Sequence, residues 1–77
     1  MVKVKVDKFH RQLGDRIRAA RIAAGFSSAA DLARAVGVEP PTFRKWERGE
    51  SEPTYPQLIE LARKTGASLD FIVAGHK

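Results

Sequence analysis

Five of the six glycines divide this 77-residue chain into segments that are each short enough to form a single helix. Apolar residues in these segments recur every three or four positions, which is the spacing of one face of an α-helix. Glycine readily adopts the left-handed backbone conformation that ends a helix, so each of the five is a predicted helix stop. They are Gly25, Gly37, Gly49, Gly66 and Gly75. The sequence therefore predicts an all-α fold of five helices.

The first two helices are predicted over residues 8–24 and 29–36. Ser28, followed three residues later by Asp31, resembles a capping box at the start of the second helix. The apolar face of the first helix comprises Phe9, Leu13, Ile17, Ala20 and Ala24, and that of the second comprises Leu32, Ala33 and Val36.

The other three helices are predicted over residues 40–48, from Thr54 to 65, and 69–74. Pro40 and Pro41 lack backbone N–H groups and fit only the first turn of a helix. Thr54 with Gln57 forms a second cap pair, and Ser68 can cap the last helix. Since no repeat or linker interrupts the pattern, we expect one domain over residues 8–77, preceded by a basic arm over residues 1–7.

The second and third helices carry the pattern of a helix-turn-helix. A steep crossing of two helices needs a small residue at the crossing, a turn residue that tolerates positive φ, and apolar anchors beneath the second helix. Ala33, Gly37, Val38, Phe43 and Trp46 supply these in order. Phe43 and Trp46 are spaced i, i+3 and are therefore interpreted as core residues and not as base-stacking residues. Thr42 and Lys45 must then face outward.

The composition favours a polyanionic partner, either nucleic acid or an anionic membrane surface. Lys and Arg total 14 against 9 Asp and Glu, a net charge of +5. The absence of Cys rules out disulfides and thiolate metal sites and is typical of a reducing compartment, so a cytoplasmic location is expected. Valine alternates with lysine near the N-terminus, which predicts neither a signal peptide nor a membrane span.

Catalytic and metal sites are not predicted. His10 and His76 stand apart from any cysteine or paired carboxylates, so both are interpreted as ordinary surface histidines. Ser27, Ser28 and Asp31 could be combined with them into a triad, but no strained nucleophile elbow or oxyanion nest accompanies them. We therefore predict a protein that is not an enzyme and that has no metal and no cofactor.

Taken together, these segments resemble the Cro/repressor-type helix-turn-helix family, also called XRE-like, over residues 13–75. The segments that carry the resemblance are LGDRIRAARIAAG, DLARAVGVEPPTFRKWERG, EPTYPQLIELARKTG and SLDFIVAG. The resemblance implies a compact five-helix repressor-like domain whose third helix lies in the DNA major groove while the second crosses the backbone. It also implies a dimer that reads two half-sites.

The resemblance assigns roles to particular residues. Thr42, Arg44 and Lys45 correspond to groove-facing positions, although the two basic residues and Arg48 could also form an ordinary solvated helix face. It further places Arg21 and Glu47 in contact as a structural ion pair. Phosphate contacts are expected at Arg48, Thr54 and Tyr55 and at Ser28, because free N–H groups and the dipole at a helix start favour anions.

Three features depart from the family pattern. Ala29 stands where a phosphate-binding glutamine is common, with a loop before it that is one residue longer, and the third helix opens on two prolines. Residues 39–52 contain three basic and four acidic residues, a net charge of −1. Positive charge lies instead in the first eleven residues, where Lys3, Lys5, Lys8 and Arg11 against Asp7 give +3.

These observations predict a homodimer that binds double-stranded DNA at an operator and regulates transcription, by repression. The alternative is an antitoxin-like or adaptor module whose acidic third-helix surface, with Glu39, Glu50 and Glu52, engages a protein partner.

Two segments have further interpretations. Val2, Val4 and Val6 alternate with Lys3 and Lys5, which fits a disordered arm, a basic arm on DNA, or an intermolecular β-ribbon. In the last helix, Leu69, Ile72 and Val73 are expected to face the core while Phe71 projects away and contributes to a dimer interface.

Overall fold

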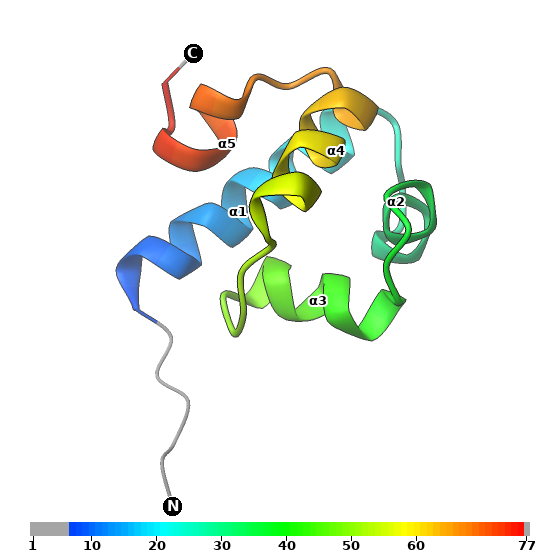
Figure 1. Cartoon of the computed structure of the whole chain (residues 1–77), viewed down its shortest axis with the longest axis horizontal. Helices are drawn as coiled ribbons and strands as arrows, with labels where there is room; N and C mark the ends of the chain where they lie inside the picture. Colours follow the sequence, from blue (N-terminus) through cyan, green and yellow to red (C-terminus); the bar gives the residue numbers. More distant parts are fainter. Residues whose placement is uncertain (1–6, 77) are drawn as a thin grey trace, which may run out of the picture.

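The computed structural model describes residues 7–76, which form five α-helices and no β-strand (Figure 1). The helices are α1 (Lys8–Ala23), α2 (Ala29–Ala35), α3 (Pro40–Arg48), α4 (Tyr55–Thr65) and α5 (Leu69–Ala74). The all-α prediction is confirmed, and α1 and α2 end one residue earlier than expected. The alternating valines and Lys3 and Lys5 lie outside the described residues. No helix within residues 7–76 is both long and apolar enough to cross a bilayer.

Side-chain caps explain where α4 and α2 begin. At α4 the predicted capping box is complete: the Thr54 hydroxyl accepts from the Gln57 N–H, and Gln57 Oε1 accepts from the Thr54 N–H at 2.7 Å. At α2 half of the predicted box is present, since Ser28 Oγ accepts from the Asp31 N–H at 3.1 Å. The Asp31 carboxylate lies instead 3.4 Å from Nη1 of Arg34, where it supports the helix as an i, i+3 pair.

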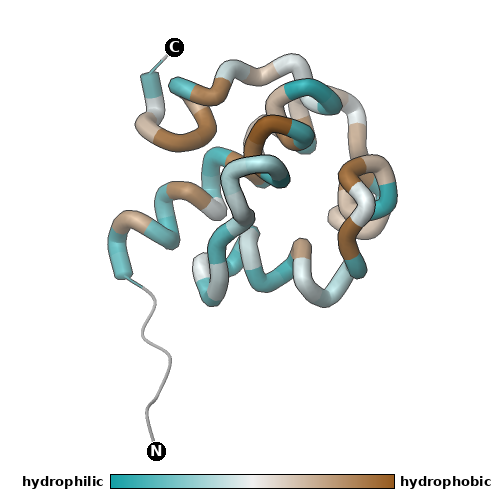
Figure 2. The backbone as a smooth tube through the Cα atoms, viewed as in Figure 1, coloured by the Kyte–Doolittle hydropathy of each residue, from teal (hydrophilic) through white to brown (hydrophobic). Residues whose placement is uncertain are grey.

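The packing is organised around α1, which contacts each of the other four helices. Hydrophobic and hydrophilic residues alternate in short blocks along α1 (Figure 2), so the helix has an apolar side to bury. Removal of apolar surface from water is the main favourable contribution to folding. The core comprises Leu13, Ile17, Leu32, Ala33, Phe43, Trp46, Leu61 and Ile72, each no more than 3% exposed.

A close approach of α1 and α3 depends on Gly14. A Cβ atom at this position would lie 2.5 Å from the carbonyl oxygen of Trp46 and 2.6 Å from that of Glu47. Both distances are shorter than van der Waals contact and involve backbone atoms, so a side chain here would push the helices apart. This role of Gly14 was not predicted from the sequence, because helix periodicity does not show which small residue lies where two helices cross.

Several predicted core positions are at the surface. Phe9 is 48% exposed and Ala24 is exposed as well. Both lie at the ends of α1, and its first turn extends beyond the helices that cover its middle (Figure 1).

In α5 the expected orientations of two residues are also wrong: Val73 is 37% exposed, whereas Phe71 is half-buried and packs against the core. Ile72 occupies the inward position, and a six-residue helix can turn few side chains to the core at once.

Arg16 of α1 holds the end of α5 in place. Its Nε donates to the carbonyl oxygen of Ile72 at 2.8 Å, and its Nη2 donates to that of Val73 at 2.9 Å. The last carbonyls of a helix have no intrahelical partner, so a guanidinium that binds two of them both satisfies and positions the helix end.

Candidate nucleic-acid interface

The turn between α2 and α3 fixes the direction of α3. Gly37 has φ = 77°, and the Val38 N–H donates to the carbonyl oxygen of Ala33 at 2.9 Å while the Gly37 N–H donates to that of Arg34 at 3.2 Å. This hydrogen-bond pattern is a Schellman motif, which ends a helix and turns the chain sharply. Ala33 is fully buried at the crossing. The predicted roles of Ala33 and Gly37 in the turn are thus consistent with the structure.

α3 has one buried and one exposed face. Phe43 and Trp46 are 0% and 2% exposed, and their ring centroids lie 5.5 Å apart at a tilt of 52°. Aromatic side chains packed in this way restrict rotation of the helix about its axis. The structure places the predicted reading residues on the other side, where Thr42, Arg44, Lys45 and Arg48 are all exposed.

The predicted contact between Arg21 and Glu47 is present and joins α1 to α3. Nε of Arg21 donates to Oε2 of Glu47 at 2.7 Å, and Nη1 of Arg21 donates to the carbonyl oxygen of Phe26 at 2.9 Å. The two charged side chains are 8% and 12% exposed. Because the guanidinium is hydrogen-bonded both to a carboxylate and to the loop after α1, it ties three segments together beneath the exposed face of α3.

Arg48 forms a second ion pair that sequence analysis did not predict. Its Nε and Nη2 donate to the two carboxylate oxygens of Glu50 at 2.9 and 3.1 Å. The hydrogen bonds from Arg48 lower the pKa of Glu50, and those to Glu50 raise the pKa of Arg48. A residue expected to bind phosphate therefore already has an anionic partner within the chain.

The start of α4 offers fewer free donors than its position suggests. The capping box occupies the N–H groups of Thr54 and Gln57, and Pro56 has none. Tyr55 is 68% exposed, so its hydroxyl is accessible. Any phosphate contact at this helix would rely on the Tyr55 N–H and the side chains. Ser28, the N-cap of α2, is exposed and has its oxygen engaged by the cap.

The interpretation of His10 as an isolated surface residue is wrong. Its Nδ1 lies 2.7 Å from Oδ1 of Asp7, and its Nε2 lies 3.4 Å from Oε1 of Glu52 in the loop before α4. The hydrogen bond with Asp7 raises the pKa of His10 and lowers that of Asp7. Neither contact was predicted from the sequence; the one with Asp7 is local (i, i+3), whereas the one with Glu52, 42 positions away, depends on the fold. In the part of the chain described, no cluster of His, Asp and Glu is arranged to hold a metal ion.

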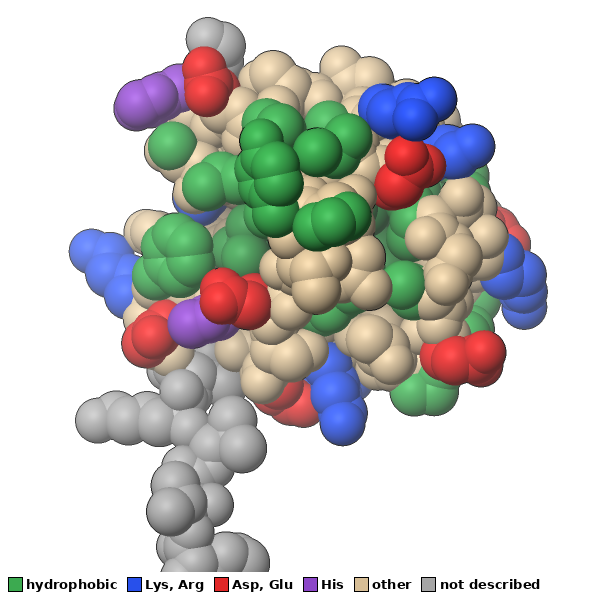
Figure 3. Space-filling model, in the orientation of Figure 1, with side chains coloured by type: hydrophobic (Ala, Val, Ile, Leu, Met, Phe, Trp, Pro, Cys, Tyr) green, Lys and Arg blue, Asp and Glu red, His purple; other side chains and the backbone are tan. Residues whose placement is uncertain are grey.

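Charge around α3 is mixed. Positive and negative side chains occur together along the edge of the molecule where α3 lies (Figure 3). The ion pairs formed among residues 7–76 include Arg48 and Glu50 but neither Arg44 nor Lys45. These two cations are therefore the ones on α3 that remain available to an external anion.

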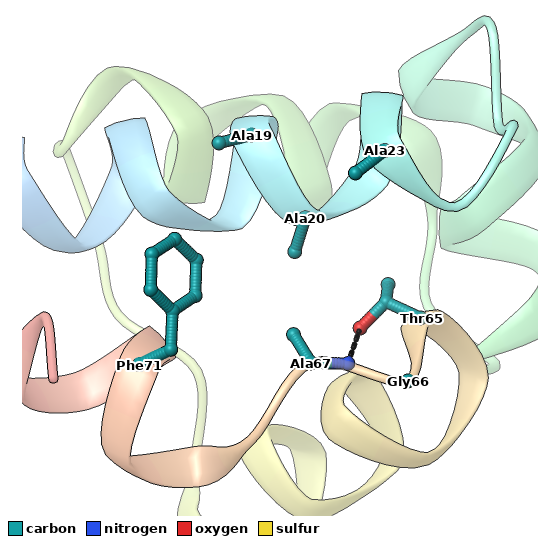
Figure 4. A pocket seen from close by; sticks show the side chains of 7 residues that line it. All are labelled: Ala19, Ala20, Ala23, Thr65, Gly66, Ala67 and Phe71. Carbon is teal, nitrogen blue, oxygen red and sulfur yellow. Dashed lines mark hydrogen bonds between the residues drawn. The ribbon is translucent and has the colours of Figure 1, made fainter. Parts of the chain in front are cut away.

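A small apolar groove lies away from α3, between α1 and the connection of α4 to α5 (Figure 4). The Thr65 hydroxyl, which also donates to the carbonyl oxygen of Leu61, accepts from the Ala67 N–H at 3.3 Å at the edge of the groove. A lining without charged side chains does not suit a phosphate or a reacting carbonyl. The lining residues are Ala19, Ala20, Ala23, Thr65, Gly66, Ala67 and Phe71.

Comparison with known proteins defines the class. A family model described as a helix-turn-helix domain matches residues 12–71, and the chain belongs to this family. Within it, the chain is a Cro/repressor-type DNA-binding domain.

Particular relatives agree with this assignment. The chain is 36% identical over 63 residues to the repressor protein C2 of Salmonella phage P22. The matched region covers 82% of this chain and 29% of that protein. It is also 33% identical over 46 residues to an uncharacterized HTH-type transcriptional regulator of Haemophilus influenzae. That matched region covers 60% of this chain and 19% of the relative. The chain thus spans less than a third of the length of either relative.

Solved structures show the same fold. The P22 c2 repressor in complex with a synthetic operator has a TM-score of 0.75 and 34% identity, covering 83% of this chain and 96% of that chain. The clp gene regulator ClgR from C. glutamicum has a TM-score of 0.77 and 26% identity, covering 90% of this chain and 88% of that chain. The predicted five-helix repressor-like fold is confirmed.

Proposed function

We propose that this domain binds double-stranded DNA sequence-specifically, with α3 in the major groove and α2 across the backbone. The observation that carries the proposal is the division of α3 into two faces: Phe43 and Trp46 are buried, while Thr42 and Lys45 are exposed. A helix held by two core aromatics presents its outer residues in a defined orientation, which direct reading of base edges requires. The structure of the similar P22 c2 repressor in complex with a synthetic operator supports DNA binding by this fold.

The exposed residues have distinct proposed roles. Lys45 can donate to guanine O6 and N7, and Thr42 can pack its methyl group on thymine or hydrogen-bond a base edge. Arg44 and Arg48 lie at the sides of the groove-facing surface and contact the flanking phosphate strands. Further phosphate contacts are proposed at the helix starts, from Ser28, Thr54 and Tyr55.

The proposed assembly is a homodimer that occupies an operator and represses transcription in the cytoplasm. Dimers of this family place two reading helices about one DNA turn apart, which doubles the contact surface. We divide the chain into a basic arm over residues 1–7, with Lys3 and Lys5 contacting phosphate, and a DNA-binding domain over residues 8–77. The positive charge of this arm compensates for the mixed charge around α3.

Selection of bound sequences from random duplex DNA tests the function, followed by affinity measurements on the selected site. Lys45→Ala should relax preference at particular base pairs, since a good base contact contributes about 1 to 3 kcal/mol of discrimination. Lys64→Ala, in the last turn of α4, is the control and should keep every preference. If both Lys45→Ala and Thr42→Ala retain the parent's preferences, α3 is not the reading helix.

A second candidate function is an antitoxin-like or adaptor module that binds a protein through the same face. It is favoured by the net charge of −1 over residues 39–52, with Glu39, Glu50 and Glu52 beside α3. Such a surface suits a basic partner better than phosphate. Failure of the selection to enrich any duplex would favour this candidate.

A further inference from the structure

The end of α3 holds an arginine and a glutamate in a fixed relation. The Gly49 N–H donates to the carbonyl oxygen of Trp46 at 3.1 Å, and the Glu50 N–H donates to that of Lys45 at 2.9 Å. Gly49 has φ = 79°, so this is a Schellman motif like the one that ends α2. The motif holds the backbone of Glu50 against the last turn of α3. In this position the Glu50 carboxylate accepts hydrogen bonds from the Arg48 guanidinium.

The contact uses one full edge of the guanidinium. Arg48 has five N–H donors, and Glu50 takes two of them, at 2.9 and 3.1 Å on Nε and Nη2. The donors on Nη1 and the second donor on Nη2 remain for another acceptor. Both side chains are accessible, at 53% and 39% exposed, so an external anion can reach the pair.

We propose that Glu50 competes within the molecule against DNA phosphate for Arg48 and thereby weakens binding to duplex DNA. This inference rests on the proposed function, in which Arg48 contacts phosphate. A phosphate on the free edge of the guanidinium would lie beside the Glu50 carboxylate, and the like charges repel; otherwise the phosphate must displace the carboxylate. In either case part of the attraction of Arg48 for DNA is cancelled. Glu50 therefore limits the sequence-independent part of affinity, which leaves a larger share of recognition to base contacts.

The test is the affinity of the full chain for a synthetic 30-base-pair duplex of mixed sequence, measured over a series of salt concentrations. Phosphate contacts do not depend on sequence, so this probe isolates them. Glu50→Gln should bind about twofold to fivefold more tightly than the parent at low salt, which is the range expected for one exposed charge pair. The gain should shrink as salt rises, because the plot of log affinity against log salt becomes steeper by up to about one unit.

A matched control is available on α4. Glu60 accepts from Nη1 of Arg63 at 3.1 Å and has the same 39% exposure as Glu50. Glu60 is not among the residues proposed to contact the groove or the phosphates, and its pair with Arg63 is on α4 and not on the reading helix. Glu60→Gln should therefore leave the affinity unchanged, although it removes the same charge from the chain.

The double variant Arg48→Ala with Glu50→Gln, compared with Arg48→Ala alone, shows whether the gain in DNA affinity from Glu50→Gln depends on Arg48. If Glu50 acts through Arg48, the gain from Glu50→Gln disappears when Arg48 is already alanine. Equal or weaker binding by Glu50→Gln would overturn the proposal and make Glu50 a residue that orients Arg48. A gain that persists in the double variant, or that Glu60→Gln reproduces, would overturn it in favour of a general charge effect.

Failure of the proposed function gives a different result. If neither the parent nor any variant binds the duplex, both the proposed function and this inference fall. If the duplex binds and Glu50→Gln strengthens binding, but selection finds no preferred sequence, the competition stands while sequence-specific reading does not.

Discussion

The guanidinium of Arg21 shows how one buried charge can fix the geometry of a surface that it does not itself reach. Arg21 is the only buried charged residue among residues 7–76, at 7% exposed, and its partner Glu47 belongs to α3. Burying a charge is costly unless it is paired and hydrogen-bonded. Since Glu47 lies next to Trp46 on the helix proposed to read DNA, the pair selects one orientation of α3 against α1.

We therefore expect Glu47→Gln to lower the free energy of unfolding by about 3 kcal/mol, because it leaves Arg21 buried beside a neutral partner. Glu60→Gln removes one partner of the exposed pair with Arg63 and should lower it by less than about 1 kcal/mol. Urea denaturation of the two variants and the parent measures the difference. Equal stabilities for parent and Glu47→Gln would mean that the pair contributes nothing to the fold.

His10 predicts a pH dependence of stability. The hydrogen bond to Asp7, with a smaller contribution from the Glu52 carboxylate, raises the pKa of His10 above its ordinary value of 6.5. A group whose pKa is raised on folding stabilises the folded state below its unfolded pKa, and this contribution is lost as pH rises through the folded pKa. The pKa of Asp7 is lowered below 3.8, so its contribution persists until acid reaches that range.

The stability difference between the parent and His10→Gln should therefore be largest near pH 5.5 and should fall toward pH 8.5. Urea denaturation at the two pH values measures it. In an Asp7→Asn background the same comparison should depend less on pH, because the largest cause of the shift is gone. A difference that is constant from pH 5.5 to 8.5 would contradict the coupling of His10 to the two carboxylates.

At the scale of the helices, the sequence predicts most of the architecture because helix ends and faces are encoded locally. Thr54 with Gln57 marks the start of α4, and Gly37 marks the end of α2, through contacts within a few residues. What sequence analysis missed lies in side-chain partners and helix approaches. The bidentate contact of Arg48 with Glu50 depends on side-chain direction after Gly49, and residues near an element end, such as Phe9, are buried only where another helix happens to cover them.

Substitution of Gly14 tests whether the fold requires the close approach of α1 and α3. In an exposed helix interior, Gly→Ala stabilises by roughly 0.5 to 1 kcal/mol. At Gly14 the new Cβ would lie 2.5 Å from a backbone carbonyl oxygen of α3, so we expect Gly14→Ala to destabilise, by about 1 to 3 kcal/mol as for other overpacked sites. Asp15→Ala, at the exposed neighbouring position, is the control. Thermal unfolding measures both, and a more stable Gly14→Ala variant would show that the helices separate without cost.

At the scale of the whole molecule, two opposite sides of α1 serve different surfaces. The Arg21 and Glu47 pair and Gly14 place α3, while Arg16 binds the carbonyl oxygens of Ile72 and Val73 and so places α5. Hydrophobic side chains gather over the face formed by α4 and α5 (Figure 3). One rigid helix therefore connects the proposed DNA-reading surface to an apolar surface on α5.

The proposed homodimer uses this apolar surface. Val73 is 37% exposed at the end of α5, and exposed apolar side chains that gather on one face are typical of protein contacts. Phe71 lines the groove and packs against the core, so it is a poor probe of the interface, since its loss would also disturb the core. Val73→Asp places a charge in the interface and leaves the buried residues unchanged.

We expect sedimentation at micromolar concentration to give a dimer for the parent and predominantly monomer for Val73→Asp. Tyr55→Asp adds the same charge at a side chain that is 68% exposed at the start of α4, and it should remain dimeric. The monomeric variant should also bind an isolated half-site as the parent does but lose the added affinity for two half-sites spaced one turn apart, since linked binding makes the second contact intramolecular. An unchanged dimer fraction in Val73→Asp would move the interface away from α5, with the N-terminal segment as the remaining proposed contact.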